Sequence, residues 1–240
     1  MFAISAASAN ADENFKKVKE VIKAIIDTYS MNKLRYGVIV FGSSATTRIA
    51  LLDDFPSDKK LKSFLNIISR ERELPDLDKA LKMGKELFYE TPERPNARRV
   101  LVVILDRKST SKLPQLRESA KMLEEDSIRV IAVAIGNEVD RNELGVITPD
   151  KTHVINVTTD VTVIDFKEKI IRKVFEGKST YRDVIKVKYL HCLSFLFHTR
   201  WTVRKIERDS IPVKWNEVLK REFLADRLRF FFDAQLTFSA

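Results

Sequence analysis

Hydrophobic residues in the first three quarters of the chain follow two alternating patterns. Phe15, Val18 and Ile22 follow one another at three- and four-residue steps, which is the spacing of an amphipathic helix. In contrast, residues 100–105 are apolar at every position, which predicts a strand covered on both faces. The alternation continues to about residue 176. It predicts an α/β fold in which a doubly wound, mostly parallel sheet is flanked by helices on both faces.

The same two patterns assign ranges to all the expected elements. The predicted strands are residues 2–6, 35–41, 46–51, 100–105, 128–135 and 152–157. The predicted helices are residues 12–29, 57–69, 76–89, 113–125, 140–146 and 162–175. The predicted core is made of apolar residues on these elements, namely Phe15, Ile22, Ile25, Val38, Val40, Val102, Ile104, Val133 and Ile135.

This architecture also indicates where function should be sought. The carboxyl ends of parallel strands meet at one edge of the sheet, and ligands of doubly wound proteins bind in the crevice outside that edge. The loops after residues 5, 42, 75 and 105 are therefore expected to carry the functional side chains.

The composition changes near Gly177. All six glycines lie at or before this residue, while both tryptophans and half of the aromatic residues follow it. We therefore divide the chain into a domain of residues 1–178 and a basic, aromatic-rich tail of residues 179–240. The structure of the tail stays unassigned, because packing on a partner and a mis-assigned exon both explain its apolar stretches.

Composition and charge exclude some classes of protein. Apolar residues make up 44% and charged residues 32%, which is typical of a soluble globular chain, and no apolar run approaches the ~20 residues of a transmembrane helix. The net charge of +9 is spread along the sequence, which argues against a nucleic-acid-binding patch. Cys192 is the single cysteine, so the chain has no internal disulfide. The first residues lack the basic and apolar regions of a signal peptide.

Several short phrases occur in the order typical of one family. Asn14-Phe15 opens the first predicted helix, residues 36–41 (Tyr-Gly-Val-Ile-Val-Phe) form the second strand, residues 102–106 (Val-Val-Ile-Leu-Asp) end the fourth and residues 131–136 (Ile-Ala-Val-Ala-Ile-Gly) end the fifth. With Glu143-Leu144 further on, the chain resembles the von Willebrand factor A family over residues 2–176, particularly the adhesive domains of extracellular matrix proteins. The resemblance implies a secreted module for cell adhesion or protein binding that is not an enzyme.

The resemblance also implies a metal-ion-dependent adhesion site, and this chain departs from its pattern. The family places Asp-x-Ser-x-Ser in the first loop, a Thr in the second and an Asp in the third. In this chain the first-loop positions fall on Ser5, Ala7 and Ala9, and the Thr position falls near Pro75, so that only Asp106 matches. Mg²⁺ binds about six oxygens in an octahedron. We therefore expect a degenerate site that holds neither Mg²⁺ nor Mn²⁺, unless a one-residue shift brings in Ser8, Asn10 or Asp76.

The remaining polar side chains at this edge form the expected rim of a protein-binding face. We expect Asp106 itself to cap a loop or to accept hydrogen bonds from nearby amides. Asn156-Val157-Thr158 is a glycosylation sequon that matters only in a secreted protein. The expected rim residues are Ser8, Asn10, Ser43, Pro75, Asp76 and Arg107.

Three hypotheses for function remain at this point. The first is a protein-binding module of the matrix type that works without metal on a matrix or cell-surface ligand. The second is a cytoplasmic scaffold domain in a multiprotein complex, whose tail binds an anionic surface through residues such as Arg200, Lys205 and Trp201. The third, an enzyme, has the weakest support, because the chain shows no phosphate-binding loop, catalytic dyad or small-molecule site.

Overall fold

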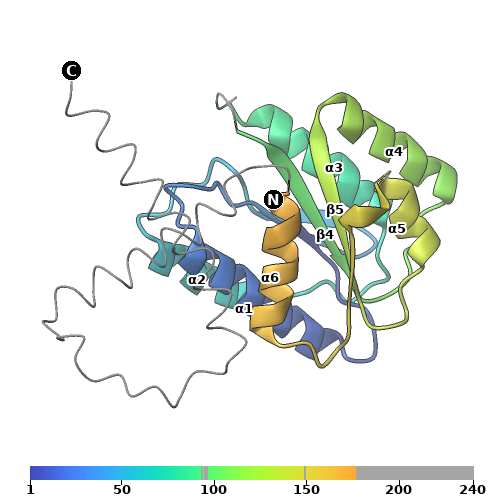
Figure 1. Ribbon diagram of the computed structural model, residues 1–240, viewed down its shortest axis with the longest axis horizontal. Coiled ribbons are helices and arrows are strands. Elements are labelled where there is room, and N and C mark those ends of the chain that lie inside the picture. The colour runs from blue at the N-terminus through green and yellow to red at the C-terminus, as the bar shows by residue number, and fades with distance from the viewer. Residues whose placement is uncertain (93, 95–96, 149, 177–240) are drawn as a thin grey trace, which may run out of the picture. The chain divides into compact units, whose positions relative to one another are not determined.

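A six-stranded sheet organises the computed structural model of the chain (Figure 1). The structure describes residues 1–92, 94, 97–148 and 150–176, which all belong to one compact unit, Met1–Tyr181. The tail and its candidate surface-binding residues lie outside the described residues. The strand order is β3-β2-β1-β4-β5-β6, and β3 alone pairs in the antiparallel sense. The predicted doubly wound, mostly parallel sheet is confirmed.

The strands form a sheet whose centre is fully covered. Phe2 pairs with Val38 on one side and with Val102 on the other, which fixes the register of the three central strands. The residues of β1 and β2 are all buried, as their uniform apolar pattern predicts. The strand bounds are Phe2–Ile4 (β1), Val38–Phe41 (β2), Ala45–Ile49 (β3), Arg99–Leu105 (β4), Ile128–Ile135 (β5) and Val154–Val157 (β6).

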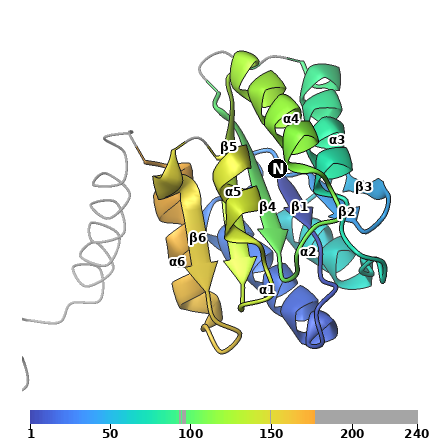
Figure 2. The same ribbon diagram turned by 90° about the vertical axis from the view of Figure 1, so that its right-hand side faces the viewer.

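The helices form two layers. In the two views of the ribbon, α1, α2 and α6 cover one face of the sheet and α3, α4 and α5 cover the other (Figures 1 and 2). Each layer buries the apolar stripe of its helices against the strands. The helix bounds are Ala11–Thr28 (α1), Asp58–Ile67 (α2), Leu77–Glu90 (α3), Leu113–Glu125 (α4), Arg141–Ile147 (α5) and Val163–Val174 (α6), and a 3₁₀ turn spans Lys151–His153.

The predicted core residues are all buried. None of the nine exposes more than 4% of its surface, from Phe15 and Ile25 at 4% down to Ile22, Val40 and Ile104 at 0%. The apolar spacing therefore identified the inward faces of α1, β2, β4 and β5 correctly.

Two local predictions were wrong. The second strand begins at Val38 and not at residue 35, because its parallel neighbour β1 begins only at Phe2, which pairs with Val38. Residues 35–37 therefore have no β1 residue to pair with in the ladder, although the carbonyl of Gly37 still accepts a hydrogen bond from the backbone N–H of Phe2. His153, predicted in a strand, ends the 3₁₀ turn before β6.

Candidate functional site

The carboxyl ends of β1, β2 and β4 meet at one edge of the sheet, as the sequence predicts. Ser5 follows β1, Gly42 follows β2 and Asp106 follows β4. The backbone N–H of Ser5 donates to the carbonyl of Ile104, and that of Asp76 donates to the carbonyl of Gly42. These hydrogen bonds bring the loops after residues 5, 42, 75 and 105 together around Asp106.

The Asp106 carboxylate is buried and accepts hydrogen bonds from the first loop. Its Oδ1 accepts from the backbone N–H groups of Ala7 at 2.7 Å and Ser8 at 3.3 Å. Its Oδ2 accepts from the hydroxyl of Ser8 at 2.7 Å and the side-chain amide of Asn14 at 2.9 Å. Only 2% of the residue is exposed, so these donors replace the water that the charge lost on burial. The carboxylate therefore fixes the loop between β1 and α1.

The donors themselves are ordered by a second contact. Asn14 is buried on the first turns of α1, and its side-chain amide also donates to the hydroxyl oxygen of Ser8 at 3.2 Å. The Ser8 hydroxyl thus accepts from Asn14 and donates to Asp106. A one-residue shift does bring Ser8 to the site, but its hydroxyl hydrogen points at the carboxylate. The three side chains form a closed triangle of hydrogen bonds.

The second and third loops are tied together by serines that follow Asp106. Asp76 caps α3, and its carboxylate accepts from the hydroxyl of Ser111 at 2.8 Å and from the backbone N–H of Lys79 at 3.4 Å. Ser109 accepts from the backbone N–H of Leu77 at 3.1 Å. Burial alone would raise the pKa of Asp76, but the hydrogen bonds from Ser111 and Lys79 and the charge of Lys79 outweigh it and lower the pKa below its ordinary value. Asp76 is thus engaged in its own cap, and no contact joins its side chain to Asp106 among the described residues.

A buried glutamate stands behind the third loop. Glu143 on α5 is 2% exposed, and its carboxylate accepts from the backbone N–H of Ser109 at 3.0 Å. Burial raises the pKa of this carboxyl, and the nearby Asp140 adds to the effect. The hydrogen bond from Ser109 to Glu143 holds the loop after β4 in place.

Two guanidinium groups flank the first loop. Arg70 donates to the carbonyl of Ala6 at 3.5 Å and Arg107 donates to the carbonyl of Ala7 at 3.2 Å. Arg70 also forms an ion pair with Asp12 at 2.5 Å, and this hydrogen bond raises the pKa of the guanidinium, with Asp106 adding a smaller contribution. Arg107 also pairs with Glu138 at 3.7 Å, so the rim around Asp106 carries paired charges of both signs.

The other predicted rim residues are not equivalent. Asn10 and Ser43 are exposed at the edge, Ser8 is half-buried against Asp106, and Arg107 is exposed. The prediction that Pro75 lies on the exposed rim was wrong, because Pro75 is buried. Its carbonyl accepts hydrogen bonds from the N–H and the hydroxyl of Thr110. Asn156 is exposed in β6.

The donor set at this edge does not fit a divalent cation. Mg²⁺ and Mn²⁺ prefer several oxygens with free lone pairs around one point. Ala7 and Ala9 bring no side-chain oxygen, and the Pro75 position brings none. The Asp106 carboxylate already accepts four hydrogen bonds, and the Asp76 carboxylate accepts from Ser111 and Lys79. No group of three His, Cys, Asp or Glu side chains suited to a metal occurs within the described ranges.

Sequence reasoning missed the residues that complete this network. Asn14 and Glu143 were noted only as parts of family phrases, and Ser109, Ser111 and Arg70 were not singled out. The run Ser109-Thr110-Ser111, which follows Asp106 by three residues, is a pattern in the sequence that could have marked this polar loop. Hydrogen-bond partners this far apart in the chain emerge only in the folded structure.

Comparison with known proteins agrees with the fold. The model of the von Willebrand factor type A domain matches residues 1–169, and the chain belongs to this family. The family consists of modules for protein interaction and adhesion that are generally not enzymes. No helix in the part of the chain that the structure describes is long and apolar enough to cross a membrane.

Solved structures of other proteins share the fold. Proximal thread matrix protein 1 from the mussel byssus has 19% sequence identity and a TM-score of 0.62, and the match covers 72% of this chain but 45% of that one. This protein has also been solved with a zinc-occupied adhesion site. The manganese-loaded TRAP protein of Plasmodium vivax has 15% identity and a TM-score of 0.55, with 70% and 71% of the two chains covered. The present chain thus matches less than half the length of the mussel protein.

Proposed function

We propose that this chain is a protein-binding module of the extracellular-matrix type, that it is not an enzyme, and that it holds its partner without a divalent metal. The observation that carries the proposal is the Asp106 carboxylate, which accepts four hydrogen bonds from Ala7, Ser8 and Asn14. Hydrogen-bond donors of the chain thus neutralise the carboxylate that a cation neutralises in metal-dependent members of the family.

The physical argument rests on competition for the same oxygens. A cation at this position would have to displace the Ser8 and Asn14 donors from Oδ2, and the buried groups so released would lose their partners. It would gain little in return, because Ala7 and Ala9 offer it no side-chain oxygen. The site therefore functions with the first loop hydrogen-bonded to Asp106 and without a bound cation.

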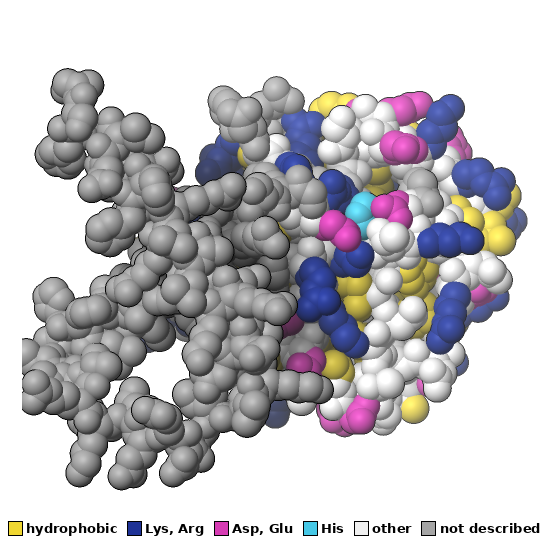
Figure 3. All heavy atoms as spheres, viewed as in Figure 1, with side chains coloured by type: hydrophobic (Ala, Val, Ile, Leu, Met, Phe, Trp, Pro, Cys, Tyr) yellow, Lys and Arg dark blue, Asp and Glu magenta, His cyan; other side chains and the backbone are white. Residues whose placement is uncertain are grey.

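A partner would then be held by the exposed side chains of the rim. Arg107 is 46% exposed at its side chain and lies 3.7 Å from Glu138, which is also half exposed. Ser43 and Asn10, in the loops after β2 and β1, are also exposed. Lys and Arg alternate with Asp and Glu over the face seen in Figure 3, which favours a protein ligand over nucleic acid on that face. We propose an extracellular matrix or cell-surface protein as this ligand, a setting like that of the byssus matrix protein with the same fold.

The metal question is tested by thermal unfolding of the full chain in EDTA and in millimolar Mg²⁺ or Mn²⁺. A ligand at about 100 times its dissociation constant adds ~2.7 kcal/mol of stability, which raises the midpoint by several degrees. We expect no such rise. A rise that disappears in Asp106→Ala but persists in Asp12→Ala, whose side chain is 89% exposed, would overturn the metal-free proposal.

Binding itself is tested on surfaces coated with decellularised matrix. We expect retention that EDTA does not reduce and that Arg107→Glu weakens. Arg117→Glu is the matched control, because Arg117 is exposed on α4 and its side chain forms no hydrogen bond or ion pair with a rim residue within the described ranges. Release by EDTA would overturn the metal-free proposal, and equal retention of the two variants would overturn the assignment of the rim.

A further inference from the structure

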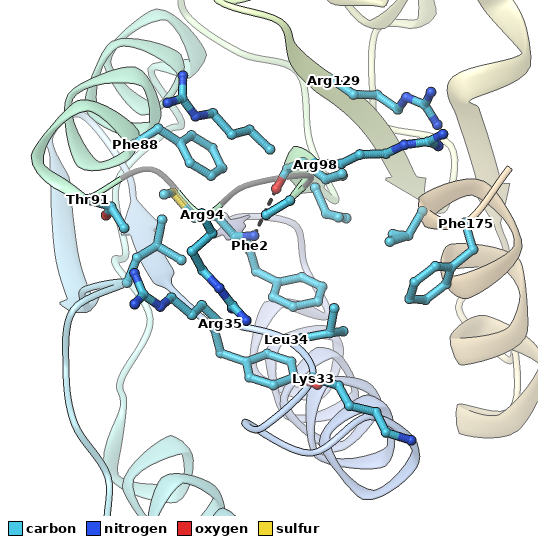
Figure 4. Close-up of a pocket in the computed structure, with 18 of the residues that line it drawn as sticks. Phe2, Lys33, Leu34, Arg35, Phe88, Thr91, Arg94, Arg98, Arg129 and Phe175 are labelled. Atoms are coloured by element: carbon cyan, nitrogen blue, oxygen red, sulfur yellow. Dashed lines mark hydrogen bonds between the residues drawn. The ribbon is translucent and has the colours of Figure 1, made fainter. Parts of the chain in front are cut away.

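A large cavity opens at the edge of the sheet opposite Asp106. Its volume is about 1060 Å³, and it is lined by residues where β1, β4 and β5 begin and where α6 ends (Figure 4). The amino group of Met1 donates to the carbonyl of Val100 at 2.8 Å in its wall. Amino ends of parallel strands form this edge, so the cavity is separate from the rim and from the function proposed for it.

The charges that line the cavity are nearly all positive. The described lining contains six Lys and Arg residues and a single carboxylate, Asp126. That carboxylate already has partners, because it pairs with Lys85 at 3.1 Å and accepts from the Tyr89 hydroxyl at 2.7 Å. The cations are Lys33, Arg35, Arg94, Arg98, Arg99 and Arg129.

These cations form two groups with apolar side chains between them. Arg35 and Arg94 lie on one side of the cavity in Figure 4, and Arg98 and Arg129 lie on the other, with Phe2 between the groups. Arg98 and Arg129 both donate one nitrogen to the carbonyl of Glu176, at 3.1 Å and 3.2 Å. Their guanidinium groups are thereby fixed in place and keep further donors for a ligand.

Three exposed cations of the lining are Arg35 and Arg94 on the first side and Lys33, which lies beside Leu34 (Figure 4). Within the described ranges, the side chains of Lys33, Arg35 and Arg94 contact no carboxylate, and all three residues are exposed. Like charges around one cavity repel each other, and a bound anion relieves this repulsion. The cavity is thus complementary to a negatively charged ligand.

We infer that this cavity binds an acidic peptide segment of a partner protein, with carboxylates on both sides of a large apolar residue. A guanidinium group matches the two oxygens of a carboxylate with parallel hydrogen bonds, and two separate groups of Arg fit two separate acidic positions. Leu34 and Phe175, both half-buried in the lining, supply contact for the apolar residue between them.

The same lining disfavours nucleic acid as the ligand. Binding of single strands relies on aromatic faces on which bases stack. Phe2 and Phe88 are only 6% and 7% exposed, and the Phe175 ring already packs on Tyr29 at 4.8 Å between centroids. The cavity therefore offers charge and apolar contact without an open stacking platform.

The inference is tested by fluorescence anisotropy with the full chain and labelled hexapeptides. The probe is Glu-Asp-Leu-Phe-Asp-Glu, and its control is Lys-Lys-Leu-Phe-Lys-Lys. We expect the acidic peptide alone to bind, with an affinity that falls as salt is added. The double variant Arg35→Glu with Arg94→Glu removes two charge-assisted contacts. Its affinity for the acidic peptide should be about tenfold weaker or more. Both side chains are exposed, so the double variant should keep the wild-type melting temperature.

Control variants separate this cavity from the rim. Arg117→Glu on α4 and Arg107→Glu at the rim carry the same change of charge elsewhere and should bind the acidic peptide as the wild type does. Equal binding of the two peptides, or an unchanged affinity in the double variant, would overturn the inference. Tighter binding of oligothymidylate or of phosphatidylserine vesicles than of the acidic peptide would also overturn it. None of these outcomes bears on whether the rim binds a matrix protein.

Discussion

The side-chain amide of Asn14 donates to Oδ2 of Asp106 at 2.9 Å and so joins the start of α1 to the end of β4, 92 residues apart. Both groups are buried, with 2% of each residue exposed. A buried carboxylate is tolerated only when donors surround it, and here the first loop and the start of α1 supply them. The Asp106 carboxylate thus forms a structural joint between two elements, the start of α1 and the end of β4.

Removing the acceptor of this joint should destabilise the domain. In Asp106→Ala, the backbone N–H of Ala7 and the amide of Asn14 lose a charged acceptor inside the protein, and we expect a loss on the order of 3 kcal/mol in the free energy of unfolding. Urea denaturation with and without EDTA measures it. The loss should be the same in both, and Asp12→Ala should change stability by less than about 0.5 kcal/mol, because Asp12 is exposed. A change near zero in the unfolding free energy of Asp106→Ala would contradict the structural role of the Asp106 carboxylate.

Two glycines on helices should respond in opposite directions to the same substitution. A Cβ on Gly84 would lie 2.9 Å from Cδ2 of Leu101, which is fully buried in β4, so Gly84→Ala forces the core apart where α3 meets the sheet. We expect a net loss of about 1–2 kcal/mol. A Cβ on Gly145 meets nothing within 4 Å, so Gly145→Ala should stabilise α5 by about 0.5–1 kcal/mol. Thermal unfolding of both variants measures these changes. Melting temperatures that shift in the same direction would contradict the packing described around Gly84 and Gly145.

Burial of the central strand is tested by two isoleucines. Ile104 is 0% exposed in β4, while Ile67 is 74% exposed at the end of α2. Ile104→Ala should cost about 2–4 kcal/mol through lost contacts and the cavity left behind. Ile67→Ala should cost less than about 0.5 kcal/mol. Equal effects in urea denaturation would refute the assignment of β4 to the centre of the sheet.

The sequence predicts the sheet and its helices well because apolar spacing is a local property. Val102 and Ile104 lie in an uninterrupted apolar run, and this alone places them between two helical layers. The sequence also places Asp106 at the functional edge and marks the weakened metal set. It does not predict which donors surround the carboxylate, because Asn14 and Asp106 meet only once α1 has packed beside β4. The cationic cavity was missed for the same reason, since Arg35, Arg94 and Arg129 come from three separate segments.

The buried glutamate behind the site should make stability depend on pH. Burial raises the pKa of Glu143 above its ordinary value of 4.5, so the folded state binds its proton more tightly than the unfolded state does. Unfolding then releases a proton as the pH rises through the window between the two pKa values, and this group's contribution to stability falls across that window. Glu143→Gln keeps an oxygen for the N–H of Ser109 and removes the titration. Urea denaturation from about pH 4 to about pH 7 should therefore show the variant gaining on the wild type as the pH rises. If the difference in unfolding free energy between the two proteins does not change with pH, the pKa of the Glu143 carboxyl is not raised by folding.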